Sequence, residues 1–300
     1  MKFSIITPVY NGERYIRETI ESVFSQNGNF EIEYIIVDGG SSDKTIEIIK
    51  EYEEKLKNNN FPLKCRSFDL KWMSKKDSGM YDAINKGFKM ATGDIFAWIN
   101  HDDKYKLGVF EIISKTFQKF PKISWLKGTT SYINSSGKLT SSGLCMVYNQ
   151  NWLSMGVYGR NAYFVYQDSV FWKRELWNKI GEIPTEYRFA GDYWLWINFA
   201  KYEKLWTLKT DTSFFRKRDK QLSSDMKKYR EEQMKISLEK GLLNLKIKIY
   251  FWIKSKLKKR WQNKIMILLY KLIFWNINRD YVDLNSTNTP IMKKINFYIC

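Results

Sequence analysis

The strongest constraint on the fold is that the first hundred residues alternate short apolar runs with amphipathic helix patterns. Strand-like runs occupy residues 3–10, 32–40 and 94–100, with a weaker one at 64–68. Helical spacing of apolar residues occupies residues 13–26, 41–56 and 80–93. A chain that alternates strands and helices in this order forms a parallel, doubly wound sheet, whose ligands bind at the carboxyl ends of the strands. We therefore predict an α/β fold with a site at that edge.

The second part of the chain has a mixed pattern. It predicts a helix at 105–120, strands at 124–134 and 139–148, a helix ending at Gly181 and another beginning at Asp192. A chain of 300 residues that is 44% hydrophobic can build one large domain with an appendage. We place the domain at 1–239, with halves of about 1–104 and 105–239, and the appendage at 240–300.

Three of the predicted strands end in small turn residues and carboxylates. The residues at these ends are Thr7, Pro8, Tyr10, Asp38, Gly39, Gly40, Asn100, Asp102 and Asp103. The neighbouring Asp102 and Asp103 repel each other unless a cation or a donor-rich ligand lies between them. Because parallel strands end at one edge of a sheet, the set predicts a cleft for a nucleotide and a metal ion. Each Asp alone is also a common turn residue.

Four ordered segments resemble those of family 2 glycosyltransferases, which are inverting enzymes of the GT-A fold that use nucleotide-sugar donors. The segments are SIITPVYNGERYIRETIESVFSQ, YIIVDGGSSDKT, KDSGMYDAINKGFKMATGDIFAWINHDD and FAGDYWLWINFA. The resemblance covers about residues 3–223. DSGMYDAINKG and QDSVFW are similar to segments of bacterial members that build surface polysaccharides and O-antigens. The resemblance implies a nucleotide-sugar half at 1–104 and an acceptor half at 105–239.

The resemblance also implies a nucleotide site and a metal site. Nucleotide contacts fall on Thr7, Pro8, Tyr10, Asp38, Asp77, Gly79 and Asp103. Asn100 and Asp102 belong to the Asp-x-Asp-like motif, in which Asp102 is expected to ligate Mg²⁺ or Mn²⁺ at the donor diphosphate. A hard cation prefers oxygen ligands and neutralises the leaving group as the anomeric bond breaks. The one histidine of the chain, His101, is expected to be a spacer that points away from the metal.

Asp192 matches the position of the family's general base. Inversion is a single displacement at the anomeric carbon, so the acceptor hydroxyl must lose its proton as it attacks. By its position alone, Asp192 is also an ordinary helix N-cap. Aromatic residues around it offer faces for a sugar, but their helical spacing favours the core for most of them. They are Trp172, Trp177, Tyr193, Trp194 and Trp196.

One segment departs from the family pattern Phe-Arg-x-His-x-x-Gln-x-Ser, whose His contacts the metal or the diphosphate. Here it reads FRKRDKQLS, so Arg218 replaces that His. Arginine does not ligate metals, but it pairs with phosphate oxygens. Either the cation has one fewer protein ligand, or Arg216 and Arg218 supply part of its charge at the diphosphate. A basic surface turn is the alternative.

The net charge of +18 is concentrated in one C-terminal segment. Residues 240–279 contain eleven Lys or Arg and no Asp or Glu, mixed with Leu, Ile, Trp and Phe at helical intervals. This pattern predicts amphipathic helices on the anionic inner surface of the cell membrane, where a polyprenyl-linked acceptor would be carried. Packing of the helices on the domain is the alternative. No nucleic acid is expected as a partner, because no recognised module is present and Lys outnumbers Arg.

Two further features indicate a cytoplasmic location. The three cysteines are far apart in the chain and odd in number, which is typical of a reducing compartment. The N-terminal apolar run is too short for a signal peptide and ends in turn residues. With the basic segment 240–279, they predict a protein bound peripherally to the inner face of the membrane.

Together these features predict an inverting hexosyltransferase. It is expected to move a sugar from a nucleotide-sugar donor, with UDP the commonest nucleotide of the family, to a saccharide or lipid-linked saccharide. One alternative is a nucleotidyltransferase, but TPVYNG stands where its Gly-rich, Arg/Lys-bearing loop would follow the first strand. The other is a non-enzymatic protein that binds a membrane surface or nucleic acid, in which the acidic strand ends are only turns.

Overall fold

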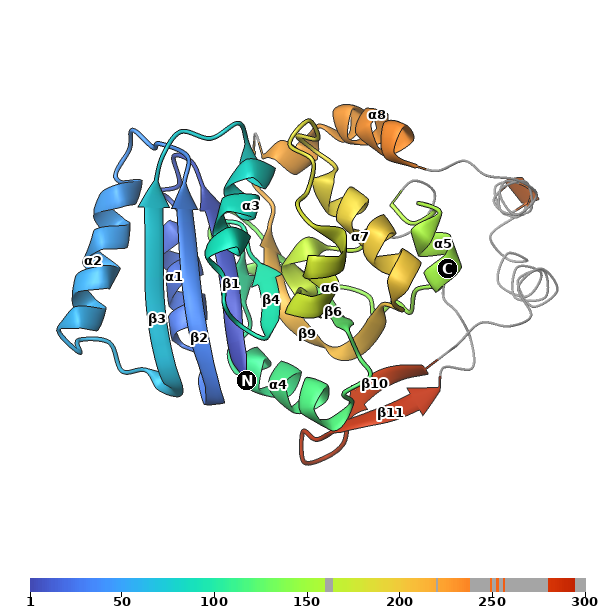
Figure 1. Cartoon of the computed structure of the whole chain (residues 1–300), viewed down its shortest axis with the longest axis horizontal. Helices are drawn as coiled ribbons and strands as arrows, with labels where there is room; N and C mark the ends of the chain where they lie inside the picture. Colours follow the sequence, from blue (N-terminus) through green and yellow to red (C-terminus); the bar gives the residue numbers. More distant parts are fainter. Residues whose placement is uncertain are drawn as a thin grey trace.

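The computed structural model (Figure 1) describes residues 1–159, 164–219, 221–237 and 280–294, together with 249, 252, 253 and 256. Within these residues the strands form one 11-stranded sheet in the order β11-β10-β9-β6-β8-β4-β1-β2-β3, with β5 paired to β9 and β7 to β6. The strands are β1 (Lys2–Val9), β2 (Asn27–Asp38), β3 (Lys64–Ser74), β4 (Ile95–Trp98), β5 (Lys104–Tyr105), β6 (Trp125–Ile133), β7 (Leu139–Ser141), β8 (Val170–Lys173), β9 (Trp206–Arg216), β10 (Asp280–Leu284) and β11 (Pro290–Lys294).

The helices of the described residues flank this sheet. They are α1 (Ile16–Phe24), α2 (Thr45–Lys57), α3 (Met80–Met90), α4 (Val109–Lys119), α5 (Gln150–Ser154), α6 (Arg174–Ile180), α7 (Gly191–Tyr202) and α8 (Met226–Ile236), with short 3₁₀ turns η1 (Gln167–Ser169) and η2 (Leu222–Ser224). The predicted α/β architecture with a mostly parallel sheet is confirmed. Strands β3, β2, β1 and β4 run parallel, and only the short β8 separates them from the parallel pair β6 and β9.

Alternation along the buried strands divides the core into two layers. In β1, Ile5 packs in the cluster with α1, α2 and α4, whereas its neighbour Ile6 packs in the cluster with α3, α6 and α7. Successive side chains of a strand point to opposite faces, so one apolar strand supplies both layers. The two layers hold the carboxyl ends of β1 and β4 side by side, since Ile6 of β1 pairs with Trp98 of β4.

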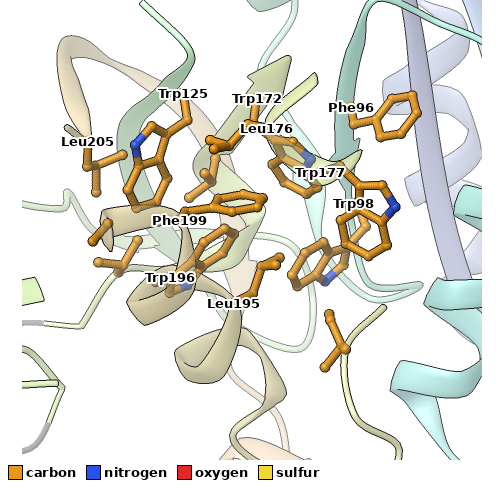
Figure 2. Packing of buried hydrophobic residues seen from close by; sticks show 14 of the residues in the cluster. Phe96, Trp98, Trp125, Trp172, Leu176, Trp177, Leu195, Trp196, Phe199 and Leu205 are labelled. Carbon is orange, nitrogen blue, oxygen red and sulfur yellow. The ribbon is translucent and has the colours of Figure 1, made fainter. Parts of the chain in front are cut away.

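The aromatic residues near α7 form the centre of one layer (Figure 2). Trp98 and Trp196 stack with ring centroids 5.6 Å apart, and Trp172 meets both rings edge to face. Trp172, Trp177, Tyr193 and Trp196 are buried, which confirms the core assignment for most of this group. Offset and edge-to-face aromatic pairs add about 0.5–1.5 kcal/mol each beyond area burial. This packing gives the floor beneath the strand ends a rigid support.

Two predicted strands differ in length from those observed. The strand expected at 139–148 ends at Ser141, because the chain passes so close to β6 at Gly143 that a Cβ there would lie 1.9 Å from the carbonyl oxygen of Thr130. The weak strand expected at 64–68 continues to Ser74, since β3 pairs with β2 in register as far as Asp38. Tertiary pairing decides both lengths.

The prediction of a helical appendage over 240–300 is wrong for residues 280–294. They form the hairpin β10–β11, which joins the main sheet where Val282 pairs with Leu208 of β9 (Figure 1, red). Val282 is fully buried, and this burial favours a strand in a segment with few helical signals. The amphipathic helices predicted at 240–279 lie outside the described residues apart from 249, 252, 253 and 256. None of the helices in the described part of the chain has the length and apolarity required to cross a bilayer.

Candidate active site

A cavity of about 560 Å³ opens at the carboxyl ends of β1 and β4. Its wall includes residues that follow these two strands, residues at the start of α3 and α7, and residues that follow β9. Parallel packing of β1 and β4 brings their ends to the same edge, as predicted from the strand order. Asp102 and Asp192, which are 90 positions apart in the sequence, line this one cavity.

The structure brings most of the predicted site residues to this wall. Those that line it are Pro8, Tyr10, Asp77, Gly79, Asn100, Asp102, Asp103, Asp192 and Arg218. Three predicted residues do not line it: Thr7, Asp38 and Arg216. Each of these three is fully buried.

Thr7 and Asp38 support the strand ends from within. Thr7 Oγ1 shares a hydrogen bond of 3.0 Å with the Tyr34 hydroxyl. Asp38 Oδ2 accepts from the backbone N–H groups of Gly40 and Ser41, both at 3.0 Å, and from the Ser74 hydroxyl at 2.6 Å. These contacts shape the turn after β2 and leave neither side chain at the cavity surface.

Asp77 reaches the cavity from the loop before α3 and rests against Gly39. A Cβ on Gly39 would lie 2.7 Å from Asp77 Oδ2, so only glycine permits this approach. Burial raises the pKa of the Asp77 carboxyl. The turn that Asp38 shapes therefore positions Asp77. Both residues were predicted to contact the nucleotide, but only Asp77 lies at the cavity wall.

The paired carboxylates after β4 have different surroundings. Asp103 is 1% exposed, and its Oδ1 accepts from the backbone N–H of Arg216 at 2.8 Å. Burial and the nearby charges of Asp102 and Asp168 raise the pKa of Asp103 well above its usual value. Asp102 Oδ2 instead accepts from Nε of Arg218 at 2.6 Å. The two neighbouring carboxyl groups coexist because their surroundings differ. Asp103 is buried against the end of β9, and Asp102 is paired with the Arg218 guanidinium.

Arg216 is a structural residue in this arrangement. Its Nε donates to the carbonyl of Asp102 at 2.9 Å, and its Nη2 to Glu18 at 2.9 Å. Its Nη1 donates to two carbonyls of the loop after β6. The guanidinium has no exposed surface, so the predicted contact between Arg216 and the donor diphosphate does not fit this geometry.

Two oxygen atoms that could ligate a hard cation lie at the end of β4. Asn100 Oδ1 is buried and has no hydrogen-bond partner among the described residues, and Asp102 Oδ1 also takes no hydrogen bond there. No cluster of three or more His, Cys, Asp or Glu residues within the described ranges is suited to hold a metal by itself. The two oxygens fit a cation that takes its remaining ligands from substrate phosphates and water, as Mg²⁺ commonly does.

His101 lies between this cavity and a second one of about 340 Å³, which Arg14 and Tyr15 also line. Its ring packs on Gly12, where a Cβ would lie 2.8 Å from His101 Cδ2. Burial lowers the pKa of His101, so the imidazole is neutral at physiological pH. Its contact with Gly12 holds the loops after β1 and β4 together.

Asp192 receives its hydrogen bonds on one carboxylate oxygen. Its Oδ1 accepts from the backbone N–H of Tyr193 at 2.7 Å and from the hydroxyls of Tyr229 at 3.2 Å and Tyr81 at 3.4 Å. Its Oδ2 takes no hydrogen bond from the described residues. Burial raises the pKa of Asp192 to about 6, despite these donors and the helix N-terminus, which favour the charged form. A carboxylate with a pKa near 6 and one open oxygen has the properties of a general base.

The N-cap of α7 is Ala190, so the reading of Asp192 as an N-cap residue is wrong. Asp192 lies in the first turn instead. The start of α7 is capped from another helix, because the Glu232 carboxylate of α8 accepts from the backbone N–H groups of Arg188, Phe189 and Ala190 at 2.9, 2.8 and 2.8 Å. The position of Asp192 therefore depends on the docking of α8.

Among the cavity residues that sequence reasoning missed are Tyr81, Tyr229, Gln167 and Asp168. Tyr229 is the one aromatic residue of α8, and no local pattern distinguishes it. Tyr81 and the Gln167–Asp168 pair lie inside segments that carry the family resemblance, DSGMYDAINKG and QDSVFW. Their place within these segments was the available signal.

A mostly parallel sheet that carries an acidic cavity at its edge is the architecture of a GT-A-type glycosyltransferase. The model of the family described as Glycosyl transferase family 2 matches residues 4–171, and the chain belongs to this family. An uncharacterised glycosyltransferase of Rickettsia typhi is 28% identical over 207 residues, which make up 68% of this chain and 60% of the relative. The minor teichoic acid biosynthesis protein GgaB of Bacillus subtilis is 32% identical over 149 residues, 47% of this chain and 15% of GgaB. The chain thus matches only part of the length of these relatives.

Solved structures share the fold. TarS of Staphylococcus aureus, residues 1–349 in complex with UDP-GlcNAc, aligns with a TM-score of 0.60 at 17% identity over 91% of this chain and 80% of that one. The mannosyltransferase PcManGT of Pyrobaculum calidifontis, in complex with GDP-Man and Mn²⁺, aligns with a TM-score of 0.56 at 14% identity over 90% and 74% of the two chains. At these identities the likeness concerns the fold alone.

Proposed function

We propose that the protein transfers a hexose from a UDP-linked donor to a saccharide acceptor with inversion at the anomeric carbon. The observation that carries this proposal is the shared cavity of Asp102 and Asp192. A diphosphate leaving group and an attacking hydroxyl lie on opposite sides of the anomeric carbon in an inverting displacement. A single cavity that has a cation-binding site at Asp102 and a base at Asp192 meets that requirement.

The donor is expected to bind along the ends of β1 and β4. Tyr10 and Asp77, which both line the cavity, would contact the nucleoside, and Gly79 would allow close approach of the backbone. The complex of TarS with UDP-GlcNAc supports a uridine nucleotide as the first candidate. Asp103 lines the cavity but is almost fully buried, and it holds the end of β9 in place through the backbone of Arg216.

The diphosphate is expected to lie at Asp102 and Arg218. GT-A glycosyltransferases commonly use a divalent metal, and the PcManGT complex contains Mn²⁺. In this chain Asp102 and Asn100 would hold Mg²⁺ or Mn²⁺, which neutralises charge on the leaving diphosphate. The Arg218 guanidinium pairs with Asp102 at the cavity wall, where its terminal amino groups would contact phosphate oxygens.

Asp192 is the proposed base for the acceptor hydroxyl. Its Oδ2 accepts the proton as the hydroxyl oxygen attacks, while Tyr81 and Tyr229 hold Oδ1 and orient the carboxylate. Aromatic side chains also line the cavity: Tyr132, Phe164, Tyr166, Phe189 and Phe215. Such faces pack against the C–H surfaces of sugars, which supports a saccharide acceptor.

The biological role is proposed from the relatives and from the basic segment. GgaB is named for teichoic acid biosynthesis, which supports a role in a bacterial surface polymer such as teichoic acid or O-antigen. The eleven basic residues of 240–279 would attract an anionic membrane surface, with about 1 kcal/mol for each residue near it. The protein would then lie at the same membrane face as an acceptor carried on a polyprenyl lipid.

A donor panel tests the proposal. The protein is incubated with UDP- and GDP-linked hexoses, Mn²⁺ and an oligosaccharide acceptor pool, and released nucleoside diphosphate is measured. We expect acceptor-dependent release from one UDP-sugar, and a product whose anomeric configuration, read by NMR, is opposite to that of the donor. Release of hexose 1-phosphate, which is what nucleotidyl transfer from a UDP- or GDP-hexose leaves, would assign the site to nucleotidyl transfer. Nucleotide binding is measured separately by thermal shift. If no nucleotide binds, the proposed function is wrong.

A further inference from the structure

Apart from Trp98 Nε1, which belongs to the aromatic layer, four buried polar atoms in the wall of the cavity have no hydrogen-bond partner among the described residues. They are Asn100 Oδ1, Gln167 Oε1, Gln167 Nε2 and Asp168 Oδ1. Buried polar atoms are nearly always paired in native proteins, because desolvation without a hydrogen bond destabilises the fold. Asn100 Oδ1 is accounted for by the proposed cation site. The three atoms of Gln167 and Asp168 are not used by any step described above.

The backbone of these two residues is held firmly. They form the 3₁₀ turn η1, which is tied by hydrogen bonds from the backbone N–H and hydroxyl of Ser169 to the carbonyl of Tyr166 at 3.3 and 2.8 Å. Asp168 is 1% exposed, and its Oδ2 accepts from the Ser213 hydroxyl of β9. The turn thus presents one anchored carboxyl oxygen to β9 and leaves Oδ1 without a partner. A rigid turn with an unpaired oxygen is suited to ligand recognition, because little order is lost on binding.

The charged side chains near Asp168 limit the chemical class of ligand that this turn can bind. Burial raises the pKa of Asp168, while the Ser213 and Thr130 hydroxyls and the Lys127 ammonium lower it. Together with burial, the charge of Asp168 raises the pKa of Asp103, so the turn places a second carboxyl group near that residue. A phosphate at this turn is disfavoured, because it would meet the carboxyl groups of Asp103 and Asp168, whereas the Lys127 ammonium near Asp168 does not line the cavity. A hydroxyl group is suited, since it donates to a carboxyl oxygen and both donates to and accepts from an amide. Tyr10 and Asp77, which are the residues proposed to contact the nucleoside, lie in loops other than this turn.

We infer that Gln167 and Asp168 form a subsite that binds hydroxyl groups of the transferred sugar. This inference rests on the proposed function and specifies the part of the donor that the turn recognises. The hexose must lie between the diphosphate at Asp102 and the base Asp192, and η1 lines the cavity that contains both. Sugar hydroxyls supply the hydrogen bonds that the three atoms lack. A site that pairs buried polar atoms with a substrate hydroxyl discriminates strongly against sugars that lack it.

The subsite is tested by comparing affinities for UDP and for a UDP-sugar. Titration calorimetry is performed on the full chain with UDP and with whichever of UDP-glucose, UDP-galactose, UDP-GlcNAc and UDP-GalNAc binds the unmodified protein most tightly. For Gln167→Ala and for the isosteric Asp168→Asn, we expect the affinity for the UDP-sugar to fall about tenfold or more while the affinity for UDP stays within twofold. Two variants are used so that a folding defect in one leaves the other informative.

Ser131→Ala is the matched control. Ser131 Oγ is also buried without a partner among the described residues, but Ser131 does not line the cavity, so its variant should leave both affinities unchanged. Equal losses of UDP and UDP-sugar affinity in the Gln167 and Asp168 variants would indicate a structural role and overturn the subsite. Unchanged UDP-sugar affinity in both variants would also overturn it. Absence of any nucleotide binding by the unmodified protein would overturn the proposed function, and the subsite with it.

Discussion

The Arg218 guanidinium at the end of β9 lies 2.6 Å, from Nε to Oδ2, from the Asp102 carboxylate that follows β4. The side chain of Arg218 is 25% exposed and that of Asp102 is 10% exposed, so the pair lies at the cavity surface. The terminal amino groups of Arg218 have no hydrogen-bond partner among the described residues. A positive charge therefore already stands where the family pattern has a histidine. A divalent cation and Arg218 would both interact with Asp102.

The first prediction concerns this pair. In Arg218→Gln we expect UDP affinity in the presence of EDTA to fall about tenfold to a hundredfold, because a charge-assisted hydrogen bond contributes about 1.5–3 kcal/mol. We also expect Mn²⁺ to bind more tightly, since Asp102 is then unpaired. Calorimetry with UDP and with Mn²⁺ measures both effects. Lys217→Gln removes the same charge from the neighbouring cavity residue and should change neither affinity by more than about twofold.

The second prediction concerns Asp192. Asp192→Asn should lower the transfer rate by about 10²–10⁴-fold, which is the usual contribution of a general base, and leave UDP affinity unchanged. Burial raises the pKa of Asp192 from 3.8 to about 6, so folding favours the protonated carboxyl and this contribution to stability is lost as pH rises through 6. The Asn variant should therefore melt above the wild type at pH 8, with a smaller difference at pH 4. Retention of more than a tenth of the transfer rate would exclude Asp192 as the base.

The third prediction is a pH dependence. Since the base must be ionised, kcat/KM should rise about tenfold per pH unit below 6 and reach a plateau above about 7. The hydrogen bond from Tyr229 favours the charged carboxylate, so Tyr229→Phe should raise the pKa of Asp192 and move the midpoint upward by about 0.5–1 pH unit. The pH profile of kcat/KM in both proteins measures the shift. A midpoint that is identical in the two proteins would assign the titration to another group.

The fourth prediction concerns the cap of α7. Glu232→Ala leaves three backbone N–H groups at the start of α7 without their carboxylate, which should lower stability by about 1–3 kcal/mol. It should also lower kcat by displacing Asp192, while UDP affinity is retained because the nucleotide wall lies on other elements. Thermal melting, kinetics and calorimetry measure the three quantities. The exposed neighbour Glu231 serves as a control, since Glu231→Ala should change none of them.

Sequence periodicity was sufficient for the fold of the first half. The alternation of apolar runs and amphipathic helices in residues 1–104 is a local property, and it specified both the parallel sheet and the edge at which Asp102 lies. The motif GDYW likewise brought Asp192 into consideration, because a family pattern is written in the sequence itself. Pairing between distant strands has no such local signature. The joining of β10 to β9 and the length of β3 followed from partners far along the chain.

Only the tertiary structure decided which acidic and basic residues reach the cavity and which of them support loops. From the sequence, Asp38 and Asp77 are equivalent candidates for contacts to the nucleotide, and Arg216 and Arg218 are equivalent candidates for contacts to the diphosphate. Burial separates them, since Asp38 and Arg216 use their polar atoms to hold loops together, whereas Asp77 and Arg218 reach the cavity. The partners that orient Asp192 come from α3 and α8, which sequence spacing does not relate to α7. Composition and pattern thus determined which groups are present, and packing determined which of them meet a substrate, because accessibility and hydrogen-bond pairing are properties of the folded chain.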